Sequence, residues 1–336
     1  MRHNLRHVLS AILQFQLIAS AGIGHAAQAK PLTKVIAGYG SADGAVAPLW
    51  YAKEMKFFEK RGLDVLLVGM GTGSVSLRAL IAKDLEIASL SASGLVQAAL
   101  QGADTVIVSS AINGFVFKIF ATPELTQISQ LKGKRVGVSR YGATSDFALR
   151  MALRKWGIVP EREVSILQIG ASQDVIRALQ TKLLDAAVLS GTASLIARKA
   201  GFRELADLAE TGLDYPMAPL GTTRSYLQKN EATVKAFMLA YIEAILEYKR
   251  NKEVALAVLK KYTRTGDREV LEDSYQNYAN KYLVMPIPTT NGIRTILAEI
   301  TGTTPAAKDA DPDRFVAYKI LREIEASGFI KKLYEK

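Results

Sequence analysis

The chain has 336 residues and a formal net charge of +11, with 43 Lys and Arg, 32 Asp and Glu, and no cysteine. The absence of cysteine excludes disulfides and thiolate nucleophiles. The length suits one large or two medium domains. Basic and acidic residues are interspersed without an arginine-rich run, a pattern that favours a solvated surface over nucleic-acid binding.

Residues 1–29 are predicted to form a cleavable secretory signal peptide. Arg2 and Arg6 give a positive start, an apolar stretch covers residues 8–23, and Ala27-Gln28-Ala29 fits a small-residue cleavage site. Cleavage after Ala26 is a second option. The glutamines within the apolar stretch argue against a membrane anchor. The pattern therefore predicts export to the periplasm.

The histidines, His3, His7 and His25, all lie inside this predicted signal peptide. The exported chain would then contain neither imidazole nor thiol. This excludes Ser-His-Asp and Cys-His catalysis, together with the usual zinc and copper sites. We therefore expect no catalytic residue, no metal site and no cofactor.

After residue 33, short apolar strands alternate with helices in two successive series. The first series has strands at residues 34–37, 63–68, 87–90 and 105–112, and helices at 48–61, 74–82 and 95–101. The second has strands at 135–138, 164–169 and 186–189, and helices at 145–156, 173–181 and 193–200. Alternation at this spacing indicates βαβ units and mostly parallel sheets.

From Glu231 the pattern becomes helical. Val234, Phe237, Met238 and Tyr241 recur at intervals of three and four residues, which predicts one apolar helix face. Further helices are expected at residues 254–262, 268–282, 293–301 and 314–326.

Three stretches resemble the nitrate/sulfonate/taurine-type substrate-binding proteins of ABC transporters, a superfamily that includes thiamin pyrimidine-precursor synthases. Residues 34–68, with Pro48-Leu49-Trp50-Tyr51-Ala52 and Gly62-Leu63-Asp64-Val65, look like the opening of these proteins. Residues 131–146, with Leu131-Lys132-Gly133-Lys134-Arg135-Val136-Gly137-Val138, look like their second-lobe start. Leu184-Asp185-Ala186-Ala187 is similar too, and the resemblance covers residues 34 to about 250.

The resemblance implies an α/β fold, the two-lobe periplasmic-binding-protein type II fold. Each lobe would be a mostly parallel sheet flanked by helices, followed by a helical C-terminal region. With hinge crossings near residues 115–121 and 215–222, lobe 1 would comprise residues 30–118 plus 219–336, and lobe 2 residues 119–218. The lobes would close on a ligand in the cleft between them.

Ligands of open α/β sheets bind beyond the carboxyl ends of the strands. In this sequence those ends are rich in Gly, Ser and Thr, and each opens a helix whose free N–H groups suit an anionic group. Arg140 follows the strand at residues 135–138, from where it could reach an acidic group of the ligand, and Tyr215 lies near the second predicted crossing, where it would form a wall of the cleft. The predicted ligand-binding residues are Ser41, Gly73, Ser74, Ser91, Ser93, Arg140, Thr144, Ser145, Ser190, Gly191, Thr192 and Tyr215.

Each of these residues also has a plain structural interpretation. Ser and Thr before a helix commonly cap it, Arg140 would also suit a solvated surface, and Tyr215 would also suit a packed hinge. The glycine-rich residues 69–73 match neither phosphate-loop pattern, so we interpret them as a turn. The recurrence of such residues at successive strand ends favours a common binding site.

The predicted function is that of a monomeric periplasmic receptor of an ABC importer. It would capture a small organic anion, a sulfonate or carboxylate, and deliver it to an ABC permease in the inner membrane, with no role for nucleic acid. Binding of a pyrimidine or other vitamin precursor, an enzyme on the same fold, and presentation of ligand to a membrane sensor are the alternatives. The enzymes of this superfamily that the resemblance suggests depend on histidine or cysteine, so we expect no enzyme here.

Overall fold

The structure, a computed structural model, describes residues 31–40 and 42–335. The predicted signal peptide and Ser41 lie outside the described residues. From Thr33 onward the chain forms one compact unit. Its strands are divided between two five-stranded sheets and a two-stranded ribbon.

The first sheet has the order β2-β1-β3-β12-β4. Its strands are β1 (Thr33–Tyr39), β2 (Leu63–Gly69), β3 (Ile87–Ser89), β4 (Thr105–Ser109) and β12 (Leu220–Thr223). β1 is parallel to β2 and β3, whereas β12 is antiparallel to its neighbours β3 and β4. β12 is therefore the one strand of this sheet that runs against the others.

The second sheet repeats this plan with the order β10-β6-β9-β7-β8. Its strands are β6 (Phe117–Ala121), β7 (Arg135–Val138), β8 (Ser165–Gln168), β9 (Ala186–Ser190) and β10 (Arg203–Asp207). β7 is parallel to β8 and β9, and β6 is antiparallel to β9 and β10. Again a single strand is reversed, so both sheets are mostly parallel, as predicted.

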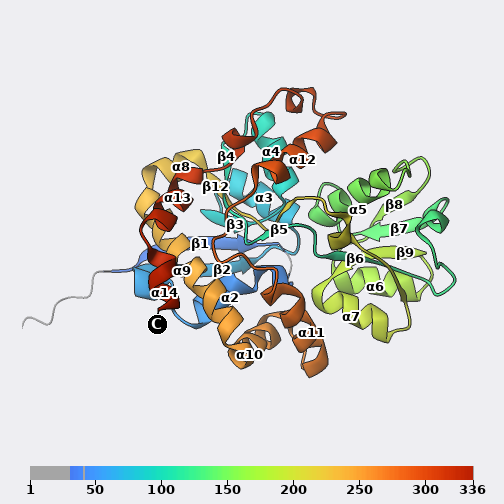
Figure 1. Ribbon diagram of the computed structural model, residues 1–336, viewed down its shortest axis with the longest axis horizontal. Helices are drawn as coiled ribbons and strands as arrows, with labels where there is room; N and C mark the ends of the chain where they lie inside the picture. Colours follow the sequence, from blue (N-terminus) through green and yellow to red (C-terminus); the bar gives the residue numbers. More distant parts are fainter. Residues whose placement is uncertain (1–30, 41, 336) are drawn as a thin grey trace, which may run out of the picture. The chain divides into compact units, whose positions relative to one another are not determined.

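A short ribbon lies between the two sheets. β5 (Ile112–Asn113) pairs antiparallel with β11 (Pro216–Met217). Along the chain, β5 lies between β4 of the first sheet and β6 of the second. On the return, β11 lies between β10 of the second sheet and β12 of the first. We call the part built on the first sheet the first lobe and the part built on the second sheet the second lobe (Figure 1). The division at residues 118/119 and 218/219 stays a proposal, and we propose that the chain crosses in this ribbon.

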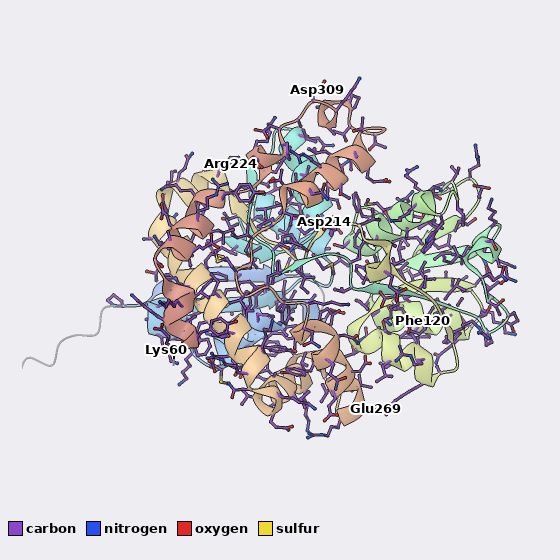
Figure 2. The ribbon with its side chains drawn as sticks, viewed as in Figure 1. Lys60, Phe120, Asp214, Arg224, Glu269 and Asp309 are labelled. Atoms are coloured by element: carbon purple, nitrogen blue, oxygen red, sulfur yellow. The ribbon has the colours of Figure 1, made fainter. Side chains whose placement is uncertain are left out.

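Helices flank both sheets. In the first lobe, α2 (Ala47–Glu54) packs on β2, α3 (Gly73–Ile81) on β1, β3 and β12, and α4 (Ala92–Leu100) on β4. In the second lobe, α5 (Thr144–Lys155), α6 (Ser172–Gln180) and α7 (Gly191–Lys199) all pack on β9. Figure 2 shows the side chain of Phe120 inside the second lobe, where it belongs to a second buried cluster of apolar residues.

The C-terminal region is helical, as predicted. It consists of α8 (Arg224–Lys229), α9 (Glu231–Arg250), α10 (Lys252–Thr263), α11 (Arg268–Ala279), α12 (Thr290–Ile300), α13 (Tyr318–Ala326) and α14 (Phe329–Tyr334). The predicted apolar face of α9 is buried and packs against α2. α11 packs on α7 of the second lobe, and α12 also contacts that lobe, because its Glu299 pairs with Arg154 of α5 at 2.9 Å.

Two helices differ from their predicted bounds for local reasons. The helix expected over residues 48–61 ends at Glu54, because Lys56 adopts a left-handed conformation with φ 57° and a separate 3-10 turn (Glu59–Arg61) follows. The helix expected to begin at Leu95 begins at Ala92, because the side chain of Ser91 accepts a hydrogen bond from the N–H of Gly94 and caps it.

None of the helices in the described part of the chain has the length and apolar character needed to cross a lipid bilayer.

Candidate functional site

A cavity of about 320 Å³ lies between the two lobes and is lined by both. The first lobe contributes the loops that follow β1, β2 and β3, and the second lobe those that follow β7, β8 and β9. Met217 of the ribbon and the adjacent Ala218 complete the wall. The cavity thus lies at the carboxyl ends of the parallel strands, where α/β folds bind ligands.

Four helices begin at this cavity, namely α3, α5, α6 and α7. α3 is capped by its own sequence, because the Thr72 side chain accepts a hydrogen bond from the N–H of Val75. The N-cap residues of α5, α6 and α7 are Ala143, Ala171 and Ser190, and none of them makes a side-chain cap hydrogen bond. Three sets of backbone N–H groups at the cavity therefore lack a capping side chain from their own N-cap residue.

The choice of alanine at two of these positions has an energetic meaning. Alanine is among the poorest N-cap residues, and replacing a good cap by alanine costs about 1 kcal/mol. The N-termini of α5 and α6 at the cavity therefore both lack the stabilisation that a capping side chain would give. The positive ends of these helices and their uncapped N–H groups together form a place where an anionic group can bind.

Asp43 is the one ionisable residue among the described residues that line the cavity. Its Oδ1 accepts a hydrogen bond from the N–H of Ala45 at 2.9 Å, and its Oδ2 accepts one from Oγ of Ser190 at 2.8 Å. Asp43 belongs to the first lobe and Ser190 to the second. This hydrogen bond therefore joins the lobes across the cavity.

Tyr278 of α11 lies beside this contact. A Cβ atom on Gly191 would lie 2.9 Å from Oδ2 of Asp43 and 3.2 Å from the hydroxyl of Tyr278. Burial, and then the charge of Asp43, raises the pKa of Tyr278 well above its usual value. The hydroxyl consequently stays protonated at neutral pH, and only a glycine fits beside the pair.

Five of the residues predicted from the sequence line the cavity: Gly73, Thr144, Ser145, Ser190 and Thr192. The Ser145 hydroxyl accepts a hydrogen bond from the N–H of Ser139 at 3.1 Å and lies 2.8 Å from the Ser139 hydroxyl. Ser145 thereby holds the loop after β7 against the start of α5. Whether these residues bind the ligand stays a prediction.

Other predicted residues lie close by without lining the cavity. Ser74 lies 3.2 Å from the Thr72 hydroxyl, and Gly191 opens α7 with φ 49°. Arg140 is partly buried, and its Nε has no hydrogen-bond partner among the described residues. Ser91 caps α4 as described, and Ser41 lies outside the described residues.

Ser93 and Tyr215 are packed together below the cavity wall. Tyr215 is fully buried, its ring lies 4.8 Å from that of Phe115 and 5.2 Å from that of Phe147, and its hydroxyl accepts a hydrogen bond from the N–H of Ser93 at 3.2 Å. Ser93 is also 2.9 Å from Ser91, hydroxyl to hydroxyl. In this structure Tyr215, which precedes β11, therefore connects the ribbon to α4, and its predicted role in ligand binding stays a prediction.

Sequence reasoning missed Asp43 and the loop before α6. Ala171, Ser172 and Gln173 line the cavity after β8, and Asp43 lines it after β1. Both segments satisfy the rule that identified the other residues, since they follow strands at their carboxyl ends. Applying that rule to every loop, whatever its residue types, would have found them.

Asp146 supports the site from inside α5. It is 4% exposed, and its carboxylate accepts hydrogen bonds from the N–H of Gly142 at 2.9 Å and from Nε of Arg150 at 2.7 Å. Burial raises the pKa of Asp146, while the Gly142 N–H and Arg150 oppose that shift. Arg150, one helical turn further along α5, thus compensates the negative charge of Asp146.

Each sheet has the same strand order, β2-β1-β3-β12-β4 in one and β8-β7-β9-β6-β10 in the other, with the fourth strand reversed. Two such sheets with a cavity at their facing strand ends are typical of the type II fold of periplasmic binding proteins. A model of the family described as "NMT1/THI5 like" matches residues 44–254. The chain belongs to this family. No curated protein sequence matches it.

Solved structures show the same fold at low sequence identity. A protein from Bordetella bronchiseptica RB50 is 20% identical, with a TM-score of 0.78 over 88% of this chain and 98% of that one. The alkanesulfonate-binding protein SsuA from Xanthomonas axonopodis pv. citri, bound to MOPS, is 19% identical, with a TM-score of 0.71 over 86% and 99%. The periplasmic nitrate-binding protein NrtA from Synechocystis PCC 6803 is 18% identical, with a TM-score of 0.68 over 88% and 89%. The predicted two-lobe fold is confirmed.

Proposed function

We propose that this protein is the periplasmic receptor of an ABC importer and that it captures a small organic anion between its two lobes. The observation that carries the proposal is the group of uncapped helix N-termini, those of α5, α6 and α7, at one cavity. One terminus contributes about 0.3–1 kcal/mol, so several on one ligand are needed for useful affinity. The folds of sulfonate-binding and nitrate-binding proteins are similar to this one, which supports the same use of the cavity.

The proposal includes export through the predicted signal peptide and delivery to a permease of the inner membrane, by a monomer. A protein that releases its ligand unchanged to a permease needs no catalytic group. The chain has no cysteine, and its three histidines all precede residue 26, which disfavours the enzymes of this superfamily that rely on those residues.

The test begins with a thermal-shift screen of the purified protein, without its predicted signal peptide. Nitrate, sulfonates, small carboxylates, amino acids and pyrimidines are each added in excess. A ligand at about a hundred times its Kd adds about 2.7 kcal/mol of stability, which is measurable as a rise in Tm. Calorimetry on each hit then gives the Kd.

The variant Ala143→Asp tests where the anion binds. An aspartate at this N-cap places a carboxylate on the N–H groups of α5, so we expect the affinity for the anionic hit to fall at least tenfold, about 1.4 kcal/mol. Ala317→Asp is the matched control, because Ala317 is also an N-cap without a side-chain cap, at the start of α13 and outside the cavity lining. It should leave the Kd unchanged.

Other outcomes would overturn the proposal. Equal loss in both variants would show that the anion does not use the start of α5. A screen in which pyrimidines bind and anions do not would favour the vitamin-precursor alternative. Consumption of the ligand would show an enzyme.

A further inference from the structure

Helix α11 joins the first lobe to the second, because it packs on α10 and on the 3-10 turn Gly44–Val46 on one side and on α7 on the other (Figure 1). The end of α11 meets the start of α7, since a Cβ on Gly191 would lie 3.2 Å from the hydroxyl of Tyr278. The start of α11 meets the end of α7, where Lys199 pairs with Asp267 at 2.9 Å. The two helices therefore run antiparallel, and the positive end of each helix dipole lies near the negative end of the other.

The two helices carry opposite charges where they meet. Lys199 of α7 pairs with Asp267 at 2.9 Å and with Glu269 at 2.7 Å, both of which belong to α11 (Figure 2). Arg198 of α7 lies 3.9 Å from Asp273 of α11. Basic groups of the second lobe thus face acidic groups of the first lobe.

Lys199 depends on the first lobe for its ion pairs. Within the described part of the chain it pairs with no acid of its own lobe, so separation of the lobes would leave its ammonium group without an acidic partner. Arg198 differs, because it also pairs with Glu204 of the second lobe at 2.5 Å. The ion pairs of Lys199 are therefore made only when the two lobes touch.

The centre of the contact between α7 and α11 contains two buried serines. Ser194 is three residues from Gly191 and four from Arg198, so it lies on the face of α7 that meets α11. Ser274 is four residues from Tyr278 and lies on the matching face of α11. Both serines are buried, and neither Oγ has a hydrogen-bond partner among the described residues. A buried hydroxyl without a partner costs free energy, and this cost opposes the ion pairs.

We propose that the contact between α7 and α11 is a latch that forms and breaks in the ligand-free protein, and that Lys199 controls it. The ion pairs favour touching lobes, whereas the unpaired hydroxyls favour separation. Lys199 lies outside the cavity lining, so it is a positioning residue. By favouring touching lobes, it raises the apparent affinity for whatever binds between them. The latch goes beyond the proposed function, because it acts without a ligand.

Salt tests the electrostatic part of the latch. Fluorescent labels on Ala82→Cys of the first lobe and Leu183→Cys of the second, both exposed positions in a chain without cysteine, report the distance between the lobes. The measured quantity is the ratio of molecules with touching lobes to molecules with separated lobes. Raising NaCl from about 0.1 M to about 1 M shortens the Debye length from about 10 Å to about 3 Å. Without ligand, we expect the ratio to fall about threefold.

Charge exchange assigns the effect to Lys199. Lys199→Glu turns both ion pairs into repulsions, so the ratio should fall about tenfold and salt should no longer lower it. Adding Glu269→Lys to Lys199→Glu restores one pair with reversed charges and should raise the ratio again. Arg162→Glu is the matched control, because it makes the same change of charge at an exposed position before β8, outside the contact, and it should leave the ratio unchanged.

A third kind of variant tests the opposing contribution of the serines. Ser194→Ala removes a buried hydroxyl that has no partner, so the ratio should rise in the ligand-free protein. A fall would show that this hydroxyl supports the contact and would overturn the proposed balance.

The remaining outcomes also decide the proposal. A single interlobe distance under every condition would show that the latch does not form and break. Equal loss in Lys199→Glu and Arg162→Glu, or no recovery on adding Glu269→Lys, would overturn the role of Lys199. Each of these results would leave the proposed receptor function standing, because the experiment contains no ligand.

Discussion

Asp185 connects two strands of the second lobe. Its carboxylate accepts hydrogen bonds from the backbone N–H of Arg135 at 2.9 Å, from Nε at 3.0 Å and from a terminal nitrogen of the same side chain at 3.1 Å. Arg135 begins β7, and Asp185 immediately precedes β9. The two residues belong to two of the three stretches that carry the family resemblance, and their contact aligns neighbouring strands of the second sheet.

This contact predicts a pH-dependent effect of Asp185→Asn. The hydrogen bond from Arg135 lowers the pKa of Asp185 below its usual value of 3.8. A lowered folded-state pKa means that the carboxylate stabilises the fold at neutral pH and that this contribution is lost as the pH falls through the folded pKa. The pair is partly exposed, so we expect Asp185→Asn to lower Tm by only about 1–3 °C at pH 7.

Thermal unfolding at pH 7 and at pH 3 measures the effect. The difference between wild type and Asp185→Asn should shrink at the lower pH. Asp84→Asn, a change at an exposed position, is the control and should alter Tm at neither pH. A difference that stays constant with pH would mean that Asp185 acts through packing rather than through its charge.

At the scale of elements, two glycines allow α3 to approach the strand ends. A Cβ on Gly40 would lie 2.6 Å from the backbone N of Gly73, and a Cβ on Gly73 would lie 2.8 Å from the backbone N of Ser91. These are contacts with backbone, which cannot rotate away. The glycines of the loops after β1 and β2 therefore allow three segments to meet at the cavity.

Gly73→Ala should consequently displace the start of α3. We expect a loss of about 1–3 kcal/mol in the free energy of unfolding, measured by urea denaturation, and weaker ligand binding. Gly302→Ala is the matched control, because a Cβ there meets nothing within 4 Å. Equal stability of the two variants would show that α3 can shift without cost.

The order and type of most elements could be predicted from the sequence, because apolar runs and glycine-rich turns alternate regularly. The break at Lys56 and strand β10 were missed. In β10, every residue is only partly buried or exposed, so the apolar signal that marks the other strands is absent. Burial of a strand depends on its neighbours in the sheet, which the local sequence does not contain.

The candidate site was predictable to the level of the loops. Strand-end reasoning pointed to Thr144 and Ser190, which line the cavity, and also to Ser93 and Tyr215, which bind each other beneath it. The direction in which a side chain at a strand end points depends on contacts with the other lobe or with the ribbon. The role of Asp43 depends on Ser190, 147 positions away, and could not be read locally.

At the scale of the whole molecule, several contacts cross between α7 and the C-terminal helix α11. Lys199 pairs with Asp267 at 2.9 Å and with Glu269 at 2.7 Å. Figure 2 shows Glu269 on α11, beside the second lobe. The hydrogen bond between Asp43 and Ser190 and the ion pair of Arg154 with Glu299 at 2.9 Å also join the two lobes. In this structure the two lobes are in contact through these residues.

We expect ligand to shift the protein toward this state in solution. Because the chain has no cysteine, Ala82→Cys with Leu183→Cys places one fluorescent label on each lobe at exposed positions. At saturating ligand, the distance between the two labels, measured by fluorescence energy transfer, should become shorter and vary over a narrower range. The pair Ala82→Cys with Gln101→Cys lies within the first lobe and should not respond. An interlobe distance that does not change when ligand is added would contradict hinge closure.

The position of β12 also determines when each lobe can form. The second sheet is drawn from one continuous stretch, Phe117 to Asp207, so it is complete as soon as that stretch has been synthesised. The first sheet is completed later, because β12, which lies between β3 and β4, is formed by Leu220–Thr223 and is synthesised after the other strands of that sheet. Until then β3 and β4 have no strand to join them. A growing chain would thus complete the sheet of its second lobe first, and β3 and β4 would not be joined through β12 until Thr223 has been made.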